Sequence, residues 1–278
     1  MRVNEDLAIS TSRILLVPYD AHHVQRYHQW MQDEDLREAT ASDLLTLEEE
    51  YENQQSWRTA HDKLTFIVCQ PATLTSTSAV TSEVDADAAI FAGEDDAEAR
   101  MVGDVNLFLT PDDDEEEEGE DQDHVSDEDK GEKGANSERK ERSDVKGEID
   151  IMIASPEHRR KGCGEAAVRA FLRFLVRHHG AILEEYGAGS SASSVKSSSI
   201  VRNVRLKRLV AKINADNAGS IRLFEKVGFH RHGQPNYFNE VTMVLSDFLP
   251  LANGTGSEDE VDRRSYRECF YDRSRLKE

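Results

Sequence analysis

The sequence has little cysteine and no long apolar run, and these two absences narrow its class. Only Cys69, Cys163 and Cys269 are cysteine among 278 residues, an odd number that cannot form a closed set of disulfides. None of the three stands in a Cys-x-x-Cys or Cys/His spacing typical of a metal site. No run of about 18 apolar residues could span a bilayer, and no secretory signal opens the chain. We therefore expect an intracellular protein, cytoplasmic or nuclear, without a membrane partner.

Positive charge is also scarce, with 34 Lys and Arg against 55 Asp and Glu and a net charge of -21. Residues 72–100 and 111–146 together carry -17 of this charge, and neither has the apolar periodicity that would offset the entropy of ordering. We predict that both are disordered insertions, as is the serine-rich segment 186–200, and that the tail 251–278 is weakly ordered. One domain within residues 1–250 remains. We expect no nucleic-acid partner, and the oligomeric state stays open.

Adjacent histidines offer the remaining metal-binding candidates. They are His22-His23 and His178-His179. Because neighbouring side chains in a helix point apart, we expect no metal at either pair.

The rest of the chain alternates between strand and helix patterns. Strands are predicted at 13–19, 63–70, 101–110, 147–154, 204–214 and 237–246. Helices are predicted at 21–36, 46–57, 162–180 and 217–229. Thr46 and Glu49 have the spacing of a capping box at the start of the second helix. The fold class predicted from this order is α/β (α+β).

One turn, between the strand at 147–154 and the helix at 162–180, has an unusual composition. Its sequence Arg159-Arg160-Lys161-Gly162-Cys163-Gly164 combines three cations with two glycines. Glycine lets the backbone turn sharply and lets a ligand approach its N–H groups. The first free amides of the helix, and the positive end of its dipole, favour an anion. A phosphate or pyrophosphate site is therefore predicted, with a basic surface turn as the plainer interpretation.

A dinucleotide site is one interpretation of this turn. No P-loop motif occurs, but Gly162, Gly164 and Ala167 fit G-x-G-x-x-A, and Glu184-Glu185 follow at the distance of a ribose-binding acid. Against this, the first glycine of that motif normally follows its strand directly, whereas residues 154–161 intervene here. The dinucleotide interpretation is therefore the weaker one.

A second interpretation comes from a family resemblance. Arg159-x-x-Gly162-x-Gly164 resembles the Q/R-x-x-G-x-G/A signature of the acyl-CoA-binding turn in the Gcn5-related N-acetyltransferase (GNAT) superfamily. Asn214-x-x-Asn217-x-x-Ser220, followed by IRLFEKVGF, resembles a second segment of that family. The amino-terminal third, with its VPYDAHHVQRYHQWMQDEDL stretch, looks like the N-acetyltransferase 9-like branch.

The resemblance implies a single GNAT-type domain, with a mixed central sheet flanked by helices and acetyl-CoA as co-substrate. It implies direct transfer of the acetyl group to a primary amine, an N-terminal α-amine or a lysine of a protein or peptide partner. It implies no metal. Acetyl-CoA would be held by Ile151, Met152, Ile153, Arg159, Arg160, Lys161, Gly162, Cys163, Gly164, Glu165, Asn214, Asn217 and Ser220, and the backbone of the first three would also polarise the thioester carbonyl.

The catalytic candidates come from the strand at 147–154, which the resemblance places beside the thioester. Glu148, Asp150 and Met152 share one face of this strand because side chains alternate along it. Either carboxylate could serve as the base that takes a proton from the amine. Asp104 on the preceding strand is a third candidate, and ordinary solvated carboxylates are the plainer interpretation of all three.

One position departs from the family pattern. Many members place a tyrosine where Phe224 stands, and its hydroxyl can protonate the departing thiolate. Tyr237 is a conceivable substitute. The alternative is a catalytically weak or inactive scaffold that binds partners through its acidic segments. Acceptor binding is expected between the two amino-terminal helices, where the aromatic candidates are Tyr27, Trp30, Tyr51 and Trp57.

Overall fold

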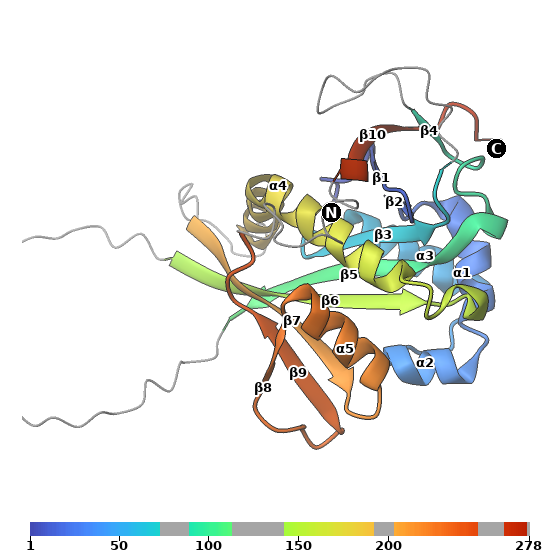
Figure 1. Ribbon diagram of the computed structural model, residues 1–278. Helices are drawn as coiled ribbons and strands as arrows, with labels where there is room; N and C mark the ends of the chain where they lie inside the picture. Colours follow the sequence, from blue (N-terminus) through green and yellow to red (C-terminus); the bar gives the residue numbers. More distant parts are fainter. Residues whose placement is uncertain (73–88, 113–141, 192–202, 250–263, 277–278) are drawn as a thin grey trace, which may run out of the picture.

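A computed structural model describes residues 1–72, 89–112, 142–191, 203–249 and 264–276 (Figure 1). Within these ranges the strands form one sheet of order β4-β10-β1-β2-β3-β5-β6-β7-β9-β8. The strands are β1 (Leu7–Ser10), β2 (Leu15–Pro18), β3 (Lys63–Cys69), β4 (Ile90–Phe91), β5 (Met101–Pro111), β6 (Arg142–Ile153), β7 (Asn203–Asn214), β8 (His230–His232), β9 (Glu240–Leu245) and β10 (Arg267–Asp272). The α-helices are α1 (Val24–Trp30), α2 (Glu34–Thr40), α3 (Leu47–Thr59), α4 (Cys163–Ser191) and α5 (Ala218–Val227).

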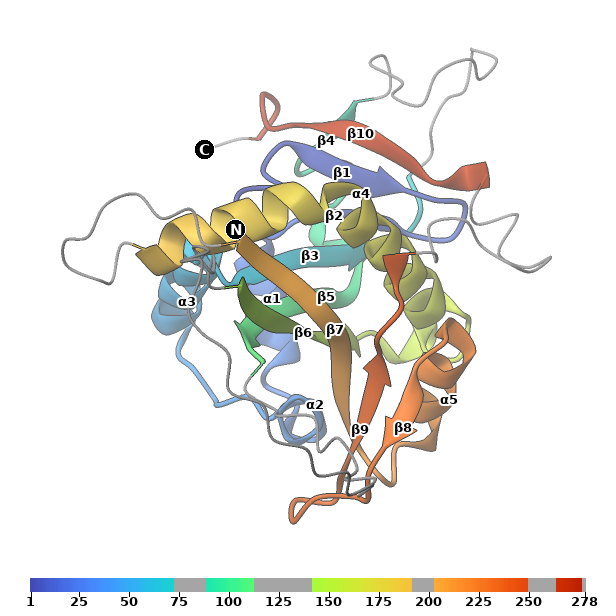
Figure 2. The same cartoon turned by 90° about the vertical axis from the view of Figure 1, so that its left-hand side faces the viewer.

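The helices cover the two faces of this sheet (Figures 1 and 2). On one face, α4 and α5 cover a large core in which Phe66 of β3 makes edge contacts with Phe171 and Phe174 of α4. On the other face, helix α1 contributes Trp30 to a smaller core. None of the helices in the described ranges combines the length and apolarity needed to cross a bilayer. The predicted mixed sheet flanked by helices is confirmed.

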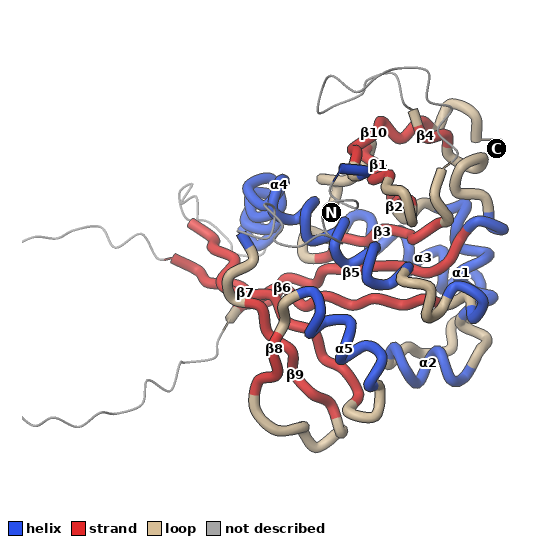
Figure 3. The backbone as a smooth tube through the Cα atoms, viewed as in Figure 1, coloured by secondary structure: helices blue, strands red, loops and turns tan. Residues whose placement is uncertain are grey.

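The strands run side by side through the middle of the molecule, with helices on both sides of them (Figure 3). Alternation along each strand decides which side chains face which layer. On β6, Ile149, Ile151 and Ile153 contact the core under α4 and α5, whereas Met152 contacts the core on the opposite face. The predicted division of this strand into two faces is therefore confirmed. On the neighbouring β5, Asp104 and Asn106 are buried although both are polar. A row of polar side chains thus lies between the sheet and helices α1 to α3.

Local signals predicted the start of α3 and the end of α5 correctly. Thr46 caps α3, and the predicted capping box with Glu49 is present in both directions. Gly228 ends α5 with a φ of 110°, a left-handed conformation that glycine adopts without strain. These ends depend on short-range hydrogen bonds, so adjacent residues suffice to predict them.

Composition was a poorer guide, and four predictions of disorder are corrected in part. Residues 89–100 contain β4 and a short 3-10 helix, residues 142–146 belong to β6, residues 186–191 extend α4, and residues 264–276 contain β10. Strand β10 pairs with β1 and β4 and buries Cys269 and Tyr271, which outweighs its charged flanks. The remaining parts of the predicted insertions and tail lie outside the described residues.

Element boundaries differ where tertiary contacts decide them. The predicted helix 21–36 is interrupted after Trp30, and α2 begins beyond the break with Asp33 as its N-cap. The predicted end of a helix at Gly180 is wrong, because Ile182 and Tyr186 continue the buried stripe of α4. The short strands β1, β4 and β8 were missed, since four residues or fewer carry too little periodicity.

Candidate active site

The sheet opens between β6 and β7. These parallel strands pair from Arg142↔Asn203 to Glu148↔Val210, and no pairing continues beyond that point. On its other side β6 stays paired with β5 as far as Ile153. The edge of β6 from Ile149 to Ile153 therefore faces β7 without a strand partner. Because backbone N–H and C=O groups need hydrogen-bond partners, this edge suits a ligand that carries amide groups.

The predicted phosphate turn follows β6 after a short 3-10 helix, Pro156–His158. Gly162 and Arg160 both have left-handed backbones, with φ of 82° and 59°. Helix α4 starts at Cys163, so its first amides have no helical acceptor and form an anion-binding end. The turn could therefore hold a pyrophosphate through its backbone.

Arg159 and Glu165 of this turn, both expected to hold acetyl-CoA, bind other parts of the chain instead. The Arg159 guanidinium donates to the carbonyls of Ile153 and Ala154 at 2.8 and 3.2 Å, so it braces the turn against β6. The Glu165 carboxylate binds Arg169 and Lys226 at 3.0 and 2.8 Å. Arg160 and Lys161 are exposed and remain the side-chain cations available to a phosphate.

Gly164 and Cys163 serve this helix start in other ways. A Cβ on Gly164 would lie 3.0 Å from Leu223, so the glycine permits close packing of α4 against α5. Burial raises the pKa of the Cys163 thiol, which does not favour a reactive thiolate.

The second family segment forms the start of α5. The Asn217 carboxamide oxygen accepts a hydrogen bond from the Ser220 amide at 3.0 Å and caps the helix. Asn214 accepts from the Asp216 amide at 2.9 Å. Asn214, Asn217 and Ser220 also line one cavity. A cofactor in this cavity could therefore contact only those polar groups of the three residues that do not take part in these hydrogen bonds.

That cavity, of about 1220 Å³, lies between α1–α3 and strands β5–β7. It is the place where the polar row of the sheet meets the open edge of β6. Of the predicted site residues, it gathers Asp104, Glu148, Asp150, Ile151, Met152, Asn214, Asn217 and Ser220, whereas Ile153 and the turn from Arg159 to Glu165 do not line it.

Two of its carboxyls have raised pKa values. Burial, together with the charge of Asp150, raises the pKa of Asp104 to about 7, against hydrogen bonds from Asn106 at 2.7 Å and Tyr27 at 3.4 Å. The other carboxylate oxygen of Asp104, Oδ1, is buried without a hydrogen-bond partner. Asp150 is accessible from the cavity, yet the surrounding walls and the charge of Glu148 raise its pKa to about 6. Both groups therefore change protonation near neutral pH.

Glu148 lies in a different environment. Its carboxylate accepts a hydrogen bond from the Lys212 ammonium at 2.8 Å, across the point where β6 and β7 separate. This ion pair leaves Glu148 less free to accept a proton than Asp150. Lys212 was missed by sequence reasoning, since a lysine in an alternating strand carries no signal of its own.

Helix α3 adds a second group that the sequence did not reveal. Glu50 is 2% exposed and lines the cavity, and no hydrogen bond or ion pair from the described part of the chain reaches its carboxylate. Burial raises its pKa. Within the acidic run of α3, nothing in the sequence distinguishes Glu50 from its exposed neighbours.

The aromatic candidates divide into two groups. Tyr27 and Trp57 line the cavity, whereas Trp30 is buried in the core and Tyr51 lies outside the lining. Phe224 also lines the cavity and packs edge-on against Phe229. Tyr237 is 96% exposed beyond the lining, so the substitution of Tyr237 for the family tyrosine is not supported.

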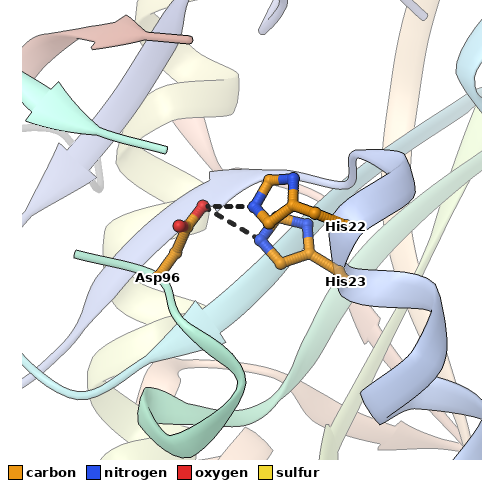
Figure 4. A group of neighbouring side chains, drawn as sticks. All are labelled: His22, His23 and Asp96. Atoms are coloured by element: carbon orange, nitrogen blue, oxygen red, sulfur yellow. Dashed lines mark hydrogen bonds and ion pairs between the residues drawn. The ribbon is translucent and has the colours of Figure 1, made fainter. Parts of the chain in front are cut away.

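The two other sequence interpretations are corrected. Glu184 and Glu185 lie within α4, and Glu185 accepts from the amides of Arg2 and Val3, so no ribose-binding strand end exists there. The argument that His22 and His23 point apart is also wrong: their ring centroids are 3.8 Å apart. Both Nε2 atoms lie against Asp96, at 3.1 and 2.9 Å (Figure 4).

These three side chains could surround a metal ion by distance alone. The backbone amide of Asp20 donates to Nδ1 of His23, which places the proton of neutral His23 on Nε2. That proton is directed at Asp96, which also accepts from Tyr271 and from the Gly93 amide. Burial lowers the pKa of His23 and keeps the ring neutral. The arrangement is that of a hydrogen-bond cluster centred on Asp96, in which His22 uses only Nε2 and its buried Nδ1 has no partner among the described residues.

An open edge between parallel strands, an anion-binding helix start beside it and an acidic cavity define an acyl-CoA-dependent transferase. Residues 13–230 match the acetyltransferase (GNAT) domain family. The N-acetyltransferase 9-like protein of Schizosaccharomyces pombe is 33% identical over 253 residues, which cover 88% of this chain and 98% of the relative.

Two further relatives match over similar lengths. The N-acetyltransferase 9-like protein of Caenorhabditis briggsae is 34% identical, covering 88% of each chain. The alpha/beta-tubulin-N-acetyltransferase 9 of Drosophila melanogaster is 34% identical, covering 87% of this chain and 88% of the relative. The chain therefore belongs to the GNAT family, in its N-acetyltransferase 9-like branch, and is an acetyl-CoA-dependent N-acetyltransferase.

Proposed function

We propose that this enzyme transfers the acetyl group of acetyl-CoA to a primary amine of a protein, an N-terminal α-amine or a lysine. The observation that carries the proposal is the pair of carboxyls with raised pKa, Asp104 and Asp150, in a cavity beside the unpaired edge of β6. Relatives in Drosophila and mouse are named alpha/beta-tubulin-N-acetyltransferase 9. Tubulin is therefore the first protein acceptor to test.

The residues present fit acetyl-CoA, which supplies an activated thioester. The unpaired edge from Ile151 to Ile153 offers N–H and C=O groups to an amide-containing arm and to the thioester carbonyl. The amides from Gly162 to Glu165 offer donors to a pyrophosphate, with Arg160 and Lys161 beside them. Arg159 holds this turn in place through its bonds to β6.

Asp150 is the proposed general base. At pH 7 about 10% of an α-amine with a pKa near 8 is neutral, against roughly 0.04% of a lysine, so removing a proton is part of the task. A carboxyl with a pKa of about 6 is mostly ionised at pH 7 and accepts a proton more readily than one at its ordinary value. Glu148, paired with Lys212, supports this role by raising the pKa of Asp150.

The departing thiolate would leave without a tyrosine acid at position 224. A thiol has a pKa near 8.5, so the thiolate is an acceptable leaving group that water can protonate. The buried phenylalanine at this position is also what favours the alternative, a weakly active scaffold.

An acetyl-transfer assay on the full chain decides between the two. Tubulin, an N-terminal peptide and a lysine peptide with a blocked N-terminus would each be incubated with acetyl-CoA, with free CoA and the mass of the acceptor measured. We expect CoA release that depends on the acceptor and a gain of one acetyl group on an amine. Tight calorimetric binding of acetyl-CoA with no transfer to any protein or peptide amine would overturn the proposal and favour the scaffold.

A further inference from the structure

The walls of the cavity are strongly acidic. Among the described residues, its lining contains nine carboxylates and a single cation, Lys212, which is already bound to Glu148. The carboxylates are Asp35, Glu38, Asp43, Glu50, Asp104, Glu148, Asp150, Asp216 and Glu240. A proton acceptor for one amine requires only one or two of them, so most of this charge has no part in the proposed transfer step.

Two of these carboxylates have incomplete sets of partners within the described part of the chain. The Glu50 side chain is 2% exposed, lines the cavity and has no hydrogen bond or ion pair there, and Asp104 has hydrogen bonds to Oδ2 while its Oδ1 is buried and unpartnered. A buried carboxylate without hydrogen bonds costs several kcal/mol, so such groups are normally paired. Both side chains line the cavity, and their missing partners would therefore come from whatever occupies it.

The two carboxylates belong to different walls of the cavity. Asp104 extends from β5 of the sheet, and Glu50 from α3. Tyr19 and Tyr27, with ring centroids 5.3 Å apart, also line the cavity, and burial together with the charges of both carboxylates raises the pKa of each phenol. A single ammonium bound at Asp104 leaves the charge of Glu50 unneutralised. An occupant that neutralises both carboxylates therefore carries two cationic groups.

A metal ion does not meet this requirement. Within the described residues, only His22, His23 and Asp96 come close enough together to surround an ion, and none of them lines the cavity. The carboxylates of the cavity are thus spread over a surface and suit an extended organic cation.

The exposed side chains near the cavity indicate that its occupant is a polypeptide. Phe238, which lines the cavity, is 74% exposed, and its neighbour Tyr237 is 96% exposed on the β8–β9 turn. Leu44 and Tyr51 are also exposed, next in sequence to the lining residues Asp43 and Glu50. Exposed apolar side chains beside an acidic cavity fit a chain that extends out of the cavity and contacts its rim.

We propose that the acceptor carries a basic side chain within a residue or two of the amine that is acetylated, and that Glu50 is the specificity-determining residue that binds this second cation. This inference rests on the proposed function and narrows its substrate class. The ammonium to be acetylated lies at Asp104 and Asp150 on the sheet wall. The guanidinium or ammonium of the neighbouring residue lies at Glu50, with Asp35 and Glu38 of α2 adding to the attraction.

Matched peptides test this directly. Two peptides with a free N-terminus differ only in their second residue, arginine in one and its neutral isostere citrulline in the other. A second pair has a blocked N-terminus and an internal lysine followed by the same two residues. For the wild-type enzyme we expect kcat/KM to favour arginine by about 10- to 100-fold in the pair that is acetylated, as for a hydrogen bond between charged groups.

The variants assign the effect to its residue. Glu50→Gln should reduce the preference to less than about 3-fold, chiefly through a loss of kcat/KM for the arginine peptide. Glu52→Gln, on the exposed face of the same helix, should keep the wild-type preference. Melting temperatures of the three proteins confirm that each is folded, and the wild-type comparison does not depend on any variant.

Each remaining outcome has a definite meaning. Acetylation of the arginine and citrulline peptides at equal rates by the wild-type enzyme overturns this inference and leaves the proposed function intact. A preference that survives in Glu50→Gln overturns the role of Glu50. Acetylation of spermidine in preference to every peptide overturns the polypeptide acceptor, and acetylation of no amine overturns the proposed function and this inference with it.

Discussion

Two buried aspartates in this molecule have opposite electrostatic environments. Asp96 lies near β4 and β10, at one edge of the sheet, and accepts hydrogen bonds from His22, His23 and Tyr271. Burial alone would raise its pKa, but these bonds outweigh burial and hold the pKa well below its usual range. Asp104, in the middle of the sheet, keeps one oxygen unpartnered, and its pKa rises to about 7.

This difference distinguishes a buried carboxylate that stabilises the fold from one that is available for chemistry. A buried carboxylate whose partners all come from the chain fastens distant segments together, as Asp96 joins the helix start at His22 to the carboxy-terminal strand. A buried carboxylate that the chain leaves incomplete is poised to exchange a proton or to bind a ligand. Removing each group should therefore affect a different property of the protein.

The largest expected effect is on catalysis, at Asp150. Asp150→Asn should lower kcat by about 10²- to 10⁴-fold at pH 7, because the general base is lost, while the KM for acetyl-CoA stays the same. In the wild-type enzyme kcat should rise with pH through about 6 as Asp150 ionises, and this limb should be absent from the residual activity of the variant. Steady-state kinetics between pH 5 and 8 measure both.

A control variant completes this test. Asp247→Asn changes an exposed aspartate outside the cavity lining and should leave the pH profile unchanged. If Asp150→Asn retained more than a tenth of the wild-type kcat, the base would have to be another group, with Asp104 the next candidate.

The effect on stability should be greatest at Asp96. Asp96→Asn should lower the free energy of unfolding by about 3–5 kcal/mol, because removing one member of a buried charged network leaves its partners unsatisfied. Glu94→Gln, in the same segment but on the surface, should change it by less than about 0.5 kcal/mol. Denaturant unfolding of the two variants measures this difference in stability. Equal unfolding midpoints would mean that the Asp96 cluster does not stabilise the fold.

The same comparison explains what could be predicted from the sequence. The capping box of Thr46, the alternation of β6 and the glycine turn depend on neighbouring residues, and the sequence predicted all three. The Asp96 cluster joins residues 22, 96 and 271 across the chain, and the acidic composition around Asp96 favoured disorder. Only long-range pairing of β10 with β1 and β4 shows that this segment is folded.

The candidate site shows the same limit. Glu148 and Asp150 were equal candidates in the sequence, because their spacing placed both on one face of the strand. What separates them is Lys212, 64 residues away, which binds only Glu148. Glu50 was indistinguishable from Glu49 and Glu52 until the packing of α3 buried it. Chemistry that depends on burial and on distant partners is not encoded in local spacing.

A smaller effect is expected in the pH dependence of stability, with opposite signs for the two aspartates. The pKa of Asp104 is about 7 in the folded protein and near 3.9 in the unfolded chain, so the folded state binds more protons between these values. Its contribution to stability therefore falls as pH rises from about 4 to 7. The depressed pKa of Asp96 works the other way, adding stability that is lost as pH falls below about 4.

Asp104→Asn isolates the first of these contributions. The variant should match the wild-type melting temperature near pH 4 and exceed it at pH 8, by an amount on the order of 1–3 kcal/mol in unfolding free energy. Thermal unfolding of both proteins across this range measures the difference. A wild-type protein that is more stable than the variant at pH 8 would show that the hydrogen bonds from Asn106 and Tyr27 outweigh the burial of Asp104.

The smallest effects are expected at two glycines near α4. One lies in the predicted phosphate-binding turn and the other in the interior of the helix. Gly162 has a φ of 82°, so Gly162→Ala should cost about 1 kcal/mol of stability and weaken acetyl-CoA binding by distorting the amides of the helix start. Gly180 lies inside α4, and an added Cβ there meets no atom within 4 Å. Gly180→Ala should therefore stabilise the protein by roughly 0.5–1 kcal/mol, because alanine favours the helix, and leave acetyl-CoA affinity unchanged. Calorimetric titration and thermal unfolding of both variants test the pair. Unchanged affinity in Gly162→Ala would mean that the pyrophosphate does not depend on the shape of this turn.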